Sequence, residues 1–106
     1  MKNKKLILGV PSRFKRRLIS QGFNPKALIL FGSRARGESL KHSDYDFLIV
    51  SDKFKRMHPL KRMEEMELLW DEPRQADFIC FTQEEFERKK KEIGITRIAV
   101  KEGVRI

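Results

Sequence analysis

Apolar and polar positions along the chain follow helical spacing in some segments and strand spacing in others. The first segment places Phe14, Leu18 and Ile19 on one helical stripe, with Pro11 near its start and Gly22 beyond its end. Proline favours the first turn of a helix, and glycine favours the position just after the last turn. These residues predict a first helix that begins at Pro11 and ends before Gly22.

Four short segments predict β-strands. Residues 27–31 and 47–50 are continuous apolar runs, which are typical of strands buried on both faces of a sheet. Residues 76–81 form a third strand of similar character, and residues 104–106 predict a short strand at the end of the chain. The strand at 47–50 is entered directly from a polar tripeptide, residues 44–46.

Three further segments predict helices. The helix that opens at Pro59 has an apolar stripe, which we expect to face the core: Leu60, Met63, Met66 and Leu69, with Trp70 beside the last. Thr82 and Glu85 have the spacing of a capping box at the start of a helix that ends near Gly94. Residues 95–102 predict a last short helix. The order predicts one domain over residues 1–106, of the α/β or α+β class, with a small mixed sheet flanked by helices.

Composition and charge narrow the context of the protein but not its activity. Lys and Arg total 24 against 15 Asp and Glu, a net charge of +9. Such an excess favours nucleic acid, nucleotides or an acidic protein as partner, although highly charged surfaces also occur in thermophilic proteins. No apolar run approaches the roughly 20 residues of a membrane span, and the basic start reaches Pro11 too soon for a signal peptide. With Cys80 as the single cysteine, we expect a cytoplasmic protein.

Three aspartates stand where strands are predicted. Asp44 and Asp46 are two residues apart at the start of a buried strand, so their side chains point to one face. Asp77 repeats the anomaly on the next strand, although aspartate is disfavoured in strands. Two like charges ~5 Å apart repel by about 3 kcal/mol at an effective dielectric constant of ~20. One such aspartate is equally well explained by a turn or a hydrogen bond, but three together predict a site for Mg²⁺ or Mn²⁺.

A glycine and a serine follow the first predicted strand. Gly32 permits close approach of a phosphate to the backbone, and the Ser33 hydroxyl adds a hydrogen-bond donor. Arg34 and Arg36 supply positive charge nearby. A turn of this kind is most often structural when it stands alone, and the P-loop motif G-x-x-x-x-G-K-[ST] is absent.

The spacing of these two elements resembles a known signature. Gly32-Ser33, ten further residues and then Asp44-x-Asp46 is similar to the motif of the DNA polymerase β-type nucleotidyltransferase superfamily. Ser43 and the third aspartate, Asp77, match as well, and the resemblance covers essentially the whole chain. Tyr45 departs from it, because an aliphatic residue is more usual between the aspartates.

The short chain resembles the minimal nucleotidyltransferase (MNT) family within that superfamily. The resemblance implies that Asp44 and Asp46 contact two metal ions and that Asp77 binds the ion that activates the acceptor hydroxyl. Gly32 and Ser33 would hold the β- and γ-phosphates of ATP, with Ser43 and Arg34 as supporting contacts. Members of this family are often the antitoxin half of HEPN/MNT pairs, which implies transfer of AMP from ATP to a tyrosine of a HEPN toxin.

Two other functions stay open at this stage. A binding module could block a partner sterically with little or no catalysis. Nucleotide addition to RNA is a third function that the net charge of +9 invites. Basic clusters are spread along the chain, which argues mildly against a single nucleic-acid groove. His42 and His58 lie in unrelated segments, so no zinc site is expected.

Overall fold

The sheet has four strands in the order β3-β2-β1-β4. Our computed structural model describes residues 4–36 and 44–106, with side chains from Gly9 onward. β1 (Ala27–Phe31) pairs antiparallel with β2 (Tyr45–Val50) and with β4 (Val104–Arg105), whereas β3 (Ala76–Phe81) runs parallel to β2. The mixed sheet predicted from the sequence is therefore confirmed.

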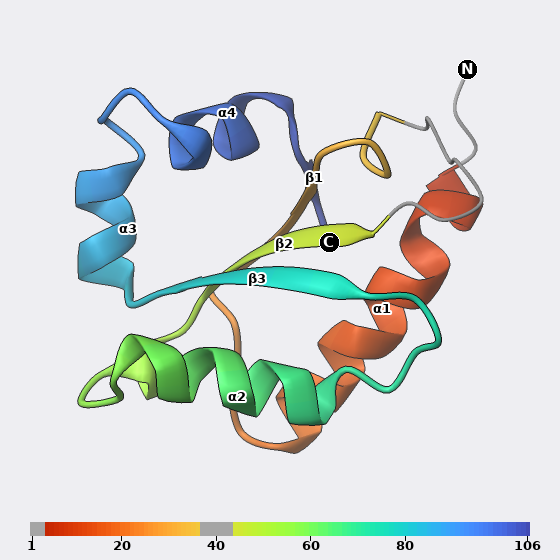
Figure 1. The fold of residues 1–106 in the computed structure, drawn as a ribbon, viewed down its shortest axis with the longest axis horizontal. Helices are drawn as coiled ribbons and strands as arrows, with labels where there is room; N and C mark the ends of the chain where they lie inside the picture. The colour runs from red at the N-terminus through yellow and green to blue at the C-terminus, as the bar shows by residue number, and fades with distance from the viewer. Residues whose placement is uncertain (1–3, 37–43) are drawn as a thin grey trace.

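Helices pack on both faces of this sheet (Figure 1). α1 (Lys4–Ser20) and α2 (Pro59–Leu69) lie on one face, and α3 (Gln83–Lys89) and α4 (Ile95–Glu102) lie on the other. A short 3-10 helix, η1 (Asp52–Phe54), follows β2. In the part of the chain described here, no helix combines the length and the apolar character needed to cross a membrane.

Alternation along each strand divides the core between the two faces. Along β2, Phe47 and Ile49 pack toward α1 and α2, whereas Leu48 and Val50 pack toward α3 and α4. The first of these layers is rich in aromatic rings, whose centroids lie 5.2 to 6.2 Å apart: Phe14, Tyr45, Phe47, Trp70 and Phe78. Asp46 lies between Tyr45 and Phe47, so its side chain faces α3 and α4.

Pro11 does not begin α1, contrary to the sequence prediction. The helix starts at Lys4, so Pro11 lies inside it. A proline there cannot donate to the carbonyl oxygen of Ile7, and it normally bends or breaks a helix. The ring of Pro11 is fully buried, and its packing offsets the missing hydrogen bond.

The sequence prediction that Leu60 and Met63 of α2 face the core is wrong. Leu60 is 64% exposed and Met63 is 43% exposed, whereas Met66 is fully buried. Residues spaced by three fall about 60° short of a full revolution at each step, so such a stripe winds around the helix. The buried face runs instead through Arg62 and Met66, four residues apart.

Arg62 occupies a buried position on this face, where an apolar residue is usual. Its guanidinium connects α2 with β3 and α3. It forms a two-pronged ion pair with Glu85 of α3, with nitrogen–oxygen distances of 2.6 and 3.3 Å. It also donates to the backbone carbonyls of Met57 and Cys80. Glu85 in turn completes the predicted capping box with Thr82, which is confirmed. Arg62 therefore ties α2 to β3 and α3.

We expect Arg62→Met to destabilise the domain by about 3 kcal/mol, because it removes a buried guanidinium that pairs with Glu85 and donates to two backbone carbonyls. Urea unfolding measures this change. The matched control is Lys61→Met, which breaks an exposed pair with Glu65 at 3.3 Å and should cost less than about 0.5 kcal/mol. Equal effects of the two substitutions would contradict a structural role for Arg62.

Candidate functional site

The aspartates singled out in the sequence lie at the same end of the sheet. Asp46 of β2 and Asp77 of β3 are direct partners in the parallel register, so their backbones are about 5 Å apart. Asp44 immediately precedes β2 and is exposed. Asp46 is half-buried, and Asp77 is exposed. The fold therefore brings together, from two strands, residues that are 31 positions apart (77 minus 46) in the chain.

The charge of Asp46 is unfavourable in this setting. Burial raises the pKa of the Asp46 carboxyl above its ordinary value, and the neighbouring charges of Asp77 and Asp44 raise the pKa further. Arg36 opposes this shift. A carboxylate held between two others in a partly buried site favours a cation among its neighbours.

Gly32 lies directly against Asp46. Phe31, the last residue of β1, pairs with Asp46 in the antiparallel register, and Gly32 follows with a φ of +77°. A Cβ atom at Gly32 would overlap the Oδ2 atom of Asp46. Only glycine therefore fits this position on both conformational and steric grounds. The backbone of the turn thus lies beside the carboxylate.

Residues 33–36 form a single helical turn after Gly32. The N–H groups of Ala35 and Arg36 both donate to the carbonyl oxygen of Gly32. Within residues 4–36 and 44–106, the Ser33 hydroxyl donates to no other residue. Backbone N–H groups and a hydroxyl at such a turn suit the oxygens of a phosphate.

The two arginines of this turn take different places. Arg34 lies over the ring of Tyr45, 4.4 Å from its centroid, and donates to the tyrosine hydroxyl at 3.4 Å. Tyr45 belongs to the layer that faces α1 and α2, so Arg34 is directed away from the face of Asp46. Arg36 is the cation whose field acts on Asp46. In the sequence, Arg36 is only a nearby positive charge, and spacing alone does not distinguish it from Arg34.

The carboxylates fit a divalent cation in kind, because Asp oxygens are ligands that Mg²⁺ prefers. Among the described residues, no three His, Cys, Asp or Glu side chains converge closely enough to share one ion. Asp44, Asp46 and Asp77 would therefore have to turn toward a common ion. Ser43, the remaining predicted contact, lies outside the described residues.

A hollow of about 440 Å³ adjoins Asp77, between the start of β3, the end of α2 and the loop that joins them. Trp70, Arg74 and Gln75 contribute to its walls. Across the sheet, the carboxylates therefore lie between this hollow and the turn that follows β1.

Comparison with known proteins identifies the family of this chain. A family model described as a nucleotidyltransferase domain matches residues 12–104. The chain belongs to this family. The crystal structure of a candidate nucleotidyltransferase from Sulfolobus solfataricus is similar, with a TM-score of 0.64 and 27% sequence identity. That match covers 93% of this chain and 78% of the other. No curated protein matches the sequence.

Among the described residues of this nucleotidyltransferase domain, neither Cys80 nor His58 is suited to act as a nucleophile or a base. Burial raises the pKa of the Cys80 thiol to about 12, so the thiol stays protonated at neutral pH. His58 caps α2, where its Nδ1 atom accepts a hydrogen bond from the backbone of Leu60. The other histidine, His42, lies outside the described residues.

Proposed function

We propose that this domain transfers a nucleoside monophosphate, AMP from ATP, to an acceptor hydroxyl with the help of magnesium. The observation that carries the proposal is the contact between Gly32 and Asp46, with Asp77 beside them in register. It brings a turn suited to phosphate within contact distance of carboxylates suited to metal. The family match over residues 12–104 supports nucleotidyl transfer as the reaction.

Following the strand order, we assign each reactant to one side of the proposed site. The Gly32–Ser33 turn after β1 would hold the β- and γ-phosphates, and the acceptor would enter at the outer side of β3. The α-phosphorus then lies over Asp46 of β2, between the attacking and the leaving oxygen. Phosphoryl-type transfer requires these two oxygens roughly in line. The order β3-β2-β1 supports such an arrangement, because the two sides of the proposed site are separated by β2.

In the reaction, the acceptor oxygen forms a bond to the α-phosphorus as the bond to the bridging oxygen of the β-phosphate breaks. Pyrophosphate leaves, and the acceptor hydroxyl proton passes to a carboxylate oxygen of Asp77 or to water beside it. Magnesium held by Asp44, Asp46 and Asp77 would polarise the phosphate and stabilise developing negative charge. Ser33 and Arg36 would hold the pyrophosphate by hydrogen bonds and charge.

A protein is the acceptor that the surface favours, as in the resemblance to HEPN/MNT pairs. The eight Phe, one Tyr and one Trp of the chain all lie in the described part, and all are buried or half-buried. Unstacked RNA bases need exposed aromatic rings as platforms. Isoleucines are exposed instead: Ile93 by 93%, Ile95 by 57% and Ile98 by 54%.

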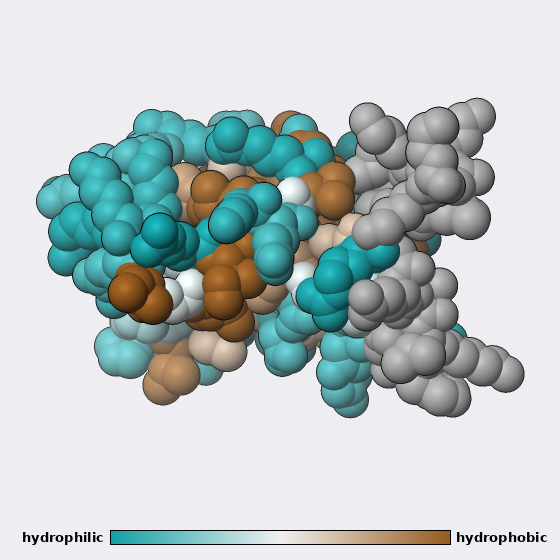
Figure 2. Space-filling view, turned by 90° about the horizontal axis from the view of Figure 1, so that it is seen from above, coloured by the Kyte–Doolittle hydropathy of each residue, from teal (hydrophilic) through white to brown (hydrophobic). Residues whose placement is uncertain are grey.

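These three isoleucines, here called the isoleucine patch, lie on the side of the molecule that carries α3 and α4. Figure 2 looks onto that side and shows apolar side chains gathered beside charged ones. Exposed apolar patches of this kind usually mark protein contacts. We therefore propose a tyrosine of a HEPN-type protein as the acceptor, positioned by contact with the patch.

The test compares acceptors directly. With ATP labelled on the α-phosphate and Mg²⁺, we expect label on a tyrosine of the protein encoded beside this chain, at least tenfold above label on tRNA 3′ ends. Ile98→Ser should lower protein labelling several-fold by weakening the apolar contact. The matched control, Leu68→Ser on α2, removes a side chain that is 78% exposed outside the patch and should change little.

Two outcomes would contradict this proposal in different ways. Efficient, selective labelling of RNA by the isolated domain would replace the protein acceptor with RNA. Partner binding and inhibition without any transferred label would favour the purely steric module. Binding measured at 50 and 200 mM salt gives an independent check, because RNA binding through many cations weakens steeply over this range.

A further inference from the structure

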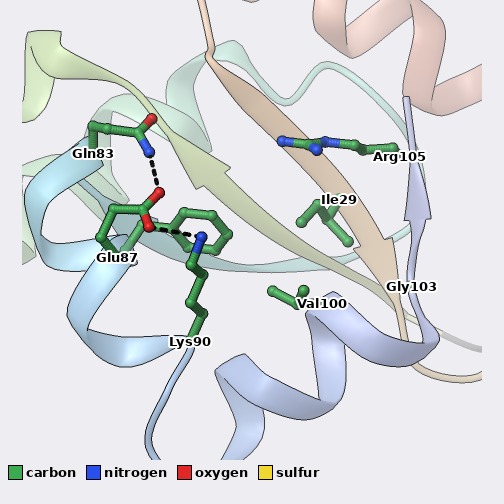
Figure 3. Close-up of a pocket in the computed structure, with 8 residues that line it drawn as sticks. Ile29, Gln83, Glu87, Lys90, Val100, Gly103 and Arg105 are labelled. Atoms are coloured by element: carbon green, nitrogen blue, oxygen red, sulfur yellow. Dashed lines mark hydrogen bonds and ion pairs between the residues drawn. The ribbon is translucent and has the colours of Figure 1, made fainter.

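A second pocket lies on the same face of the sheet as Asp46 and Asp77. It measures about 360 Å³ and opens between α3, α4 and the β1–β4 edge (Figure 3). Its apolar lining comes from Ile29 of β1, Phe86 of α3 and Val100 of α4, and four polar or charged side chains line the rest. Volumes of ~300 Å³ and above are typical of small-molecule sites.

The polar rim of this pocket combines donors and acceptors. Gln83 donates to Glu87 at 2.7 Å, and Lys90 pairs with the other oxygen of Glu87 at 2.7 Å. Both contacts hold the Glu87 carboxylate at the mouth of the pocket, as Figure 3 shows. Lys90 is thereby neutralised, which leaves Arg105 as the cation that faces a ligand.

Arg105 is placed by the strand pairing. It is the register partner of Ile29, so its side chain rises from the same face of the sheet. In Figure 3 it extends from β4 across β1. Within the described residues it forms no hydrogen bond or ion pair with any other side chain or carbonyl. A planar guanidinium beside an apolar lining suits a flat, heteroaromatic ring, on which it can stack.

The position of the pocket relative to the carboxylates fits a nucleotide. Ile29 precedes Gly32 by three residues, about 10 Å along β1. In-line transfer uses the direction across the strands for the acceptor and the pyrophosphate. The nucleoside is attached to the same α-phosphorus, so it must leave that line at an angle. The direction along β1, from the Gly32 turn toward Ile29, runs at an angle to that line. It leads to the pocket.

We propose that the pocket between α3, α4 and the β1–β4 edge binds the nucleoside part of the nucleotide, with Arg105 stacked on the base. Gln83 and Glu87 face the edge of the base, where an amide and a carboxylate can distinguish one base from another by hydrogen bonds. This inference rests on the proposed function, because it assigns the second half of the same substrate. Arg105 is a binding residue in this assignment, not a catalytic one.

The experiment measures binding of two probes, MgATP and magnesium tripolyphosphate, by titration calorimetry. Arg105→Gln should weaken MgATP at least tenfold and leave tripolyphosphate within about twofold, because only MgATP carries a nucleoside. Val100→Trp, at a position that is 43% exposed, should fill the pocket and give the same pattern. The matched control is Arg97→Gln, an exposed arginine of α4 outside the pocket, which should affect neither probe.

The outcomes separate this inference from the proposed function. If the wild type binds MgATP and both Arg105→Gln and Val100→Trp bind it equally well, the nucleoside lies elsewhere and the inference is overturned. Equal weakening of both probes in Arg105→Gln would make Arg105 a phosphate contact, which also overturns it. A wild type that binds neither probe would overturn the proposed function itself, and the inference with it.

Discussion

Replacing Asp46 with asparagine should reduce nucleotidyl transfer about a thousandfold, roughly 4 kcal/mol in barrier terms, while raising the melting temperature of the ligand-free domain. The activity falls because asparagine removes the charge that would hold the metal beside the Gly32 turn. Stability rises because ionised Asp46 is half-buried and is repelled by Asp77 and Asp44. Because water screens these charges at a partly exposed site, the gain should stay below about 1 kcal/mol, which would raise the melting temperature by no more than roughly 4 to 8 °C for a domain of this size.

The pH dependence of this stability gain has a definite sign. The pKa of Asp46 is raised in the folded state above its ordinary value of 3.8. The stability that protonation of Asp46 supplies is therefore complete below pH 3.8 and is lost as the pH rises through the folded pKa. Asparagine cannot ionise, so Asp46→Asn should exceed the wild type in stability near neutral pH, and the difference should vanish as the pH approaches 4.

Calorimetric melting from pH 4 to pH 8, together with transfer assays, measures both effects. Asp71→Asn is the matched control, because Asp71 is exposed in the loop before β3 and outside the carboxylate group. It should leave transfer unchanged and shift the melting temperature little. If Asp46→Asn retains activity near that of the wild type, Asp46 is not a metal ligand and the proposed site is wrong.

Replacing Gly32 with alanine should cost both activity and stability. Its φ of +77° is unfavourable for alanine, at about 1 to 2 kcal/mol. The added methyl group would also overlap the Asp46 carboxylate, so either the turn or the carboxylate must move. We expect transfer to fall at least 100-fold, because a displacement of about 1 Å in a reacting geometry has effects of this size.

Gly9→Ala provides the contrast for Gly32→Ala. A Cβ atom at Gly9 meets nothing within 4 Å, and Gly9 lies in the interior of α1. Alanine there should stabilise the domain by up to about 1 kcal/mol and leave transfer intact. Urea unfolding and transfer assays on both variants check the pair. Full activity in Gly32→Ala would show that the turn can separate from Asp46 without loss.

Local signals predicted most of the fold. The strand at residues 76–81 and the capping box of Thr82 and Glu85 are confirmed, because alternation and capping depend on residues close in sequence. The start of α1 and the exposed face of α2 were predicted wrongly. Those features depend on packing against distant segments. This packing buries Pro11, and it buries Arg62 of α2 while Met63 stays exposed.

In the candidate site, too, the local features were predictable from the sequence and the features that depend on packing were not. The spacing from Gly32 to Asp46 is local enough to be read in the sequence, and the strand register brings Asp77 beside it. The different directions of Arg34 and Arg36 follow from the packing of Tyr45, which no spacing rule contains. The pocket at Arg105 was not predicted, because it combines β1 with helices and a strand more than fifty residues later. The catalytic roles of the three aspartates stay predictions.

The parallel pairing of β2 with β3 has a consequence for the order in which the domain assembles. β1 and β2 are antiparallel neighbours in the sequence, so Gly32 and Asp46 can meet through a short loop closure. Asp77 joins them only after the chain has crossed over through α2 and paired in parallel, a non-local and slower event. A complete set of three carboxylates therefore exists only when this parallel pairing is in place. A partly folded chain in which only β1 and β2 have paired carries the Gly32 turn without Asp77 beside it, so the proposed cation site forms later than the turn.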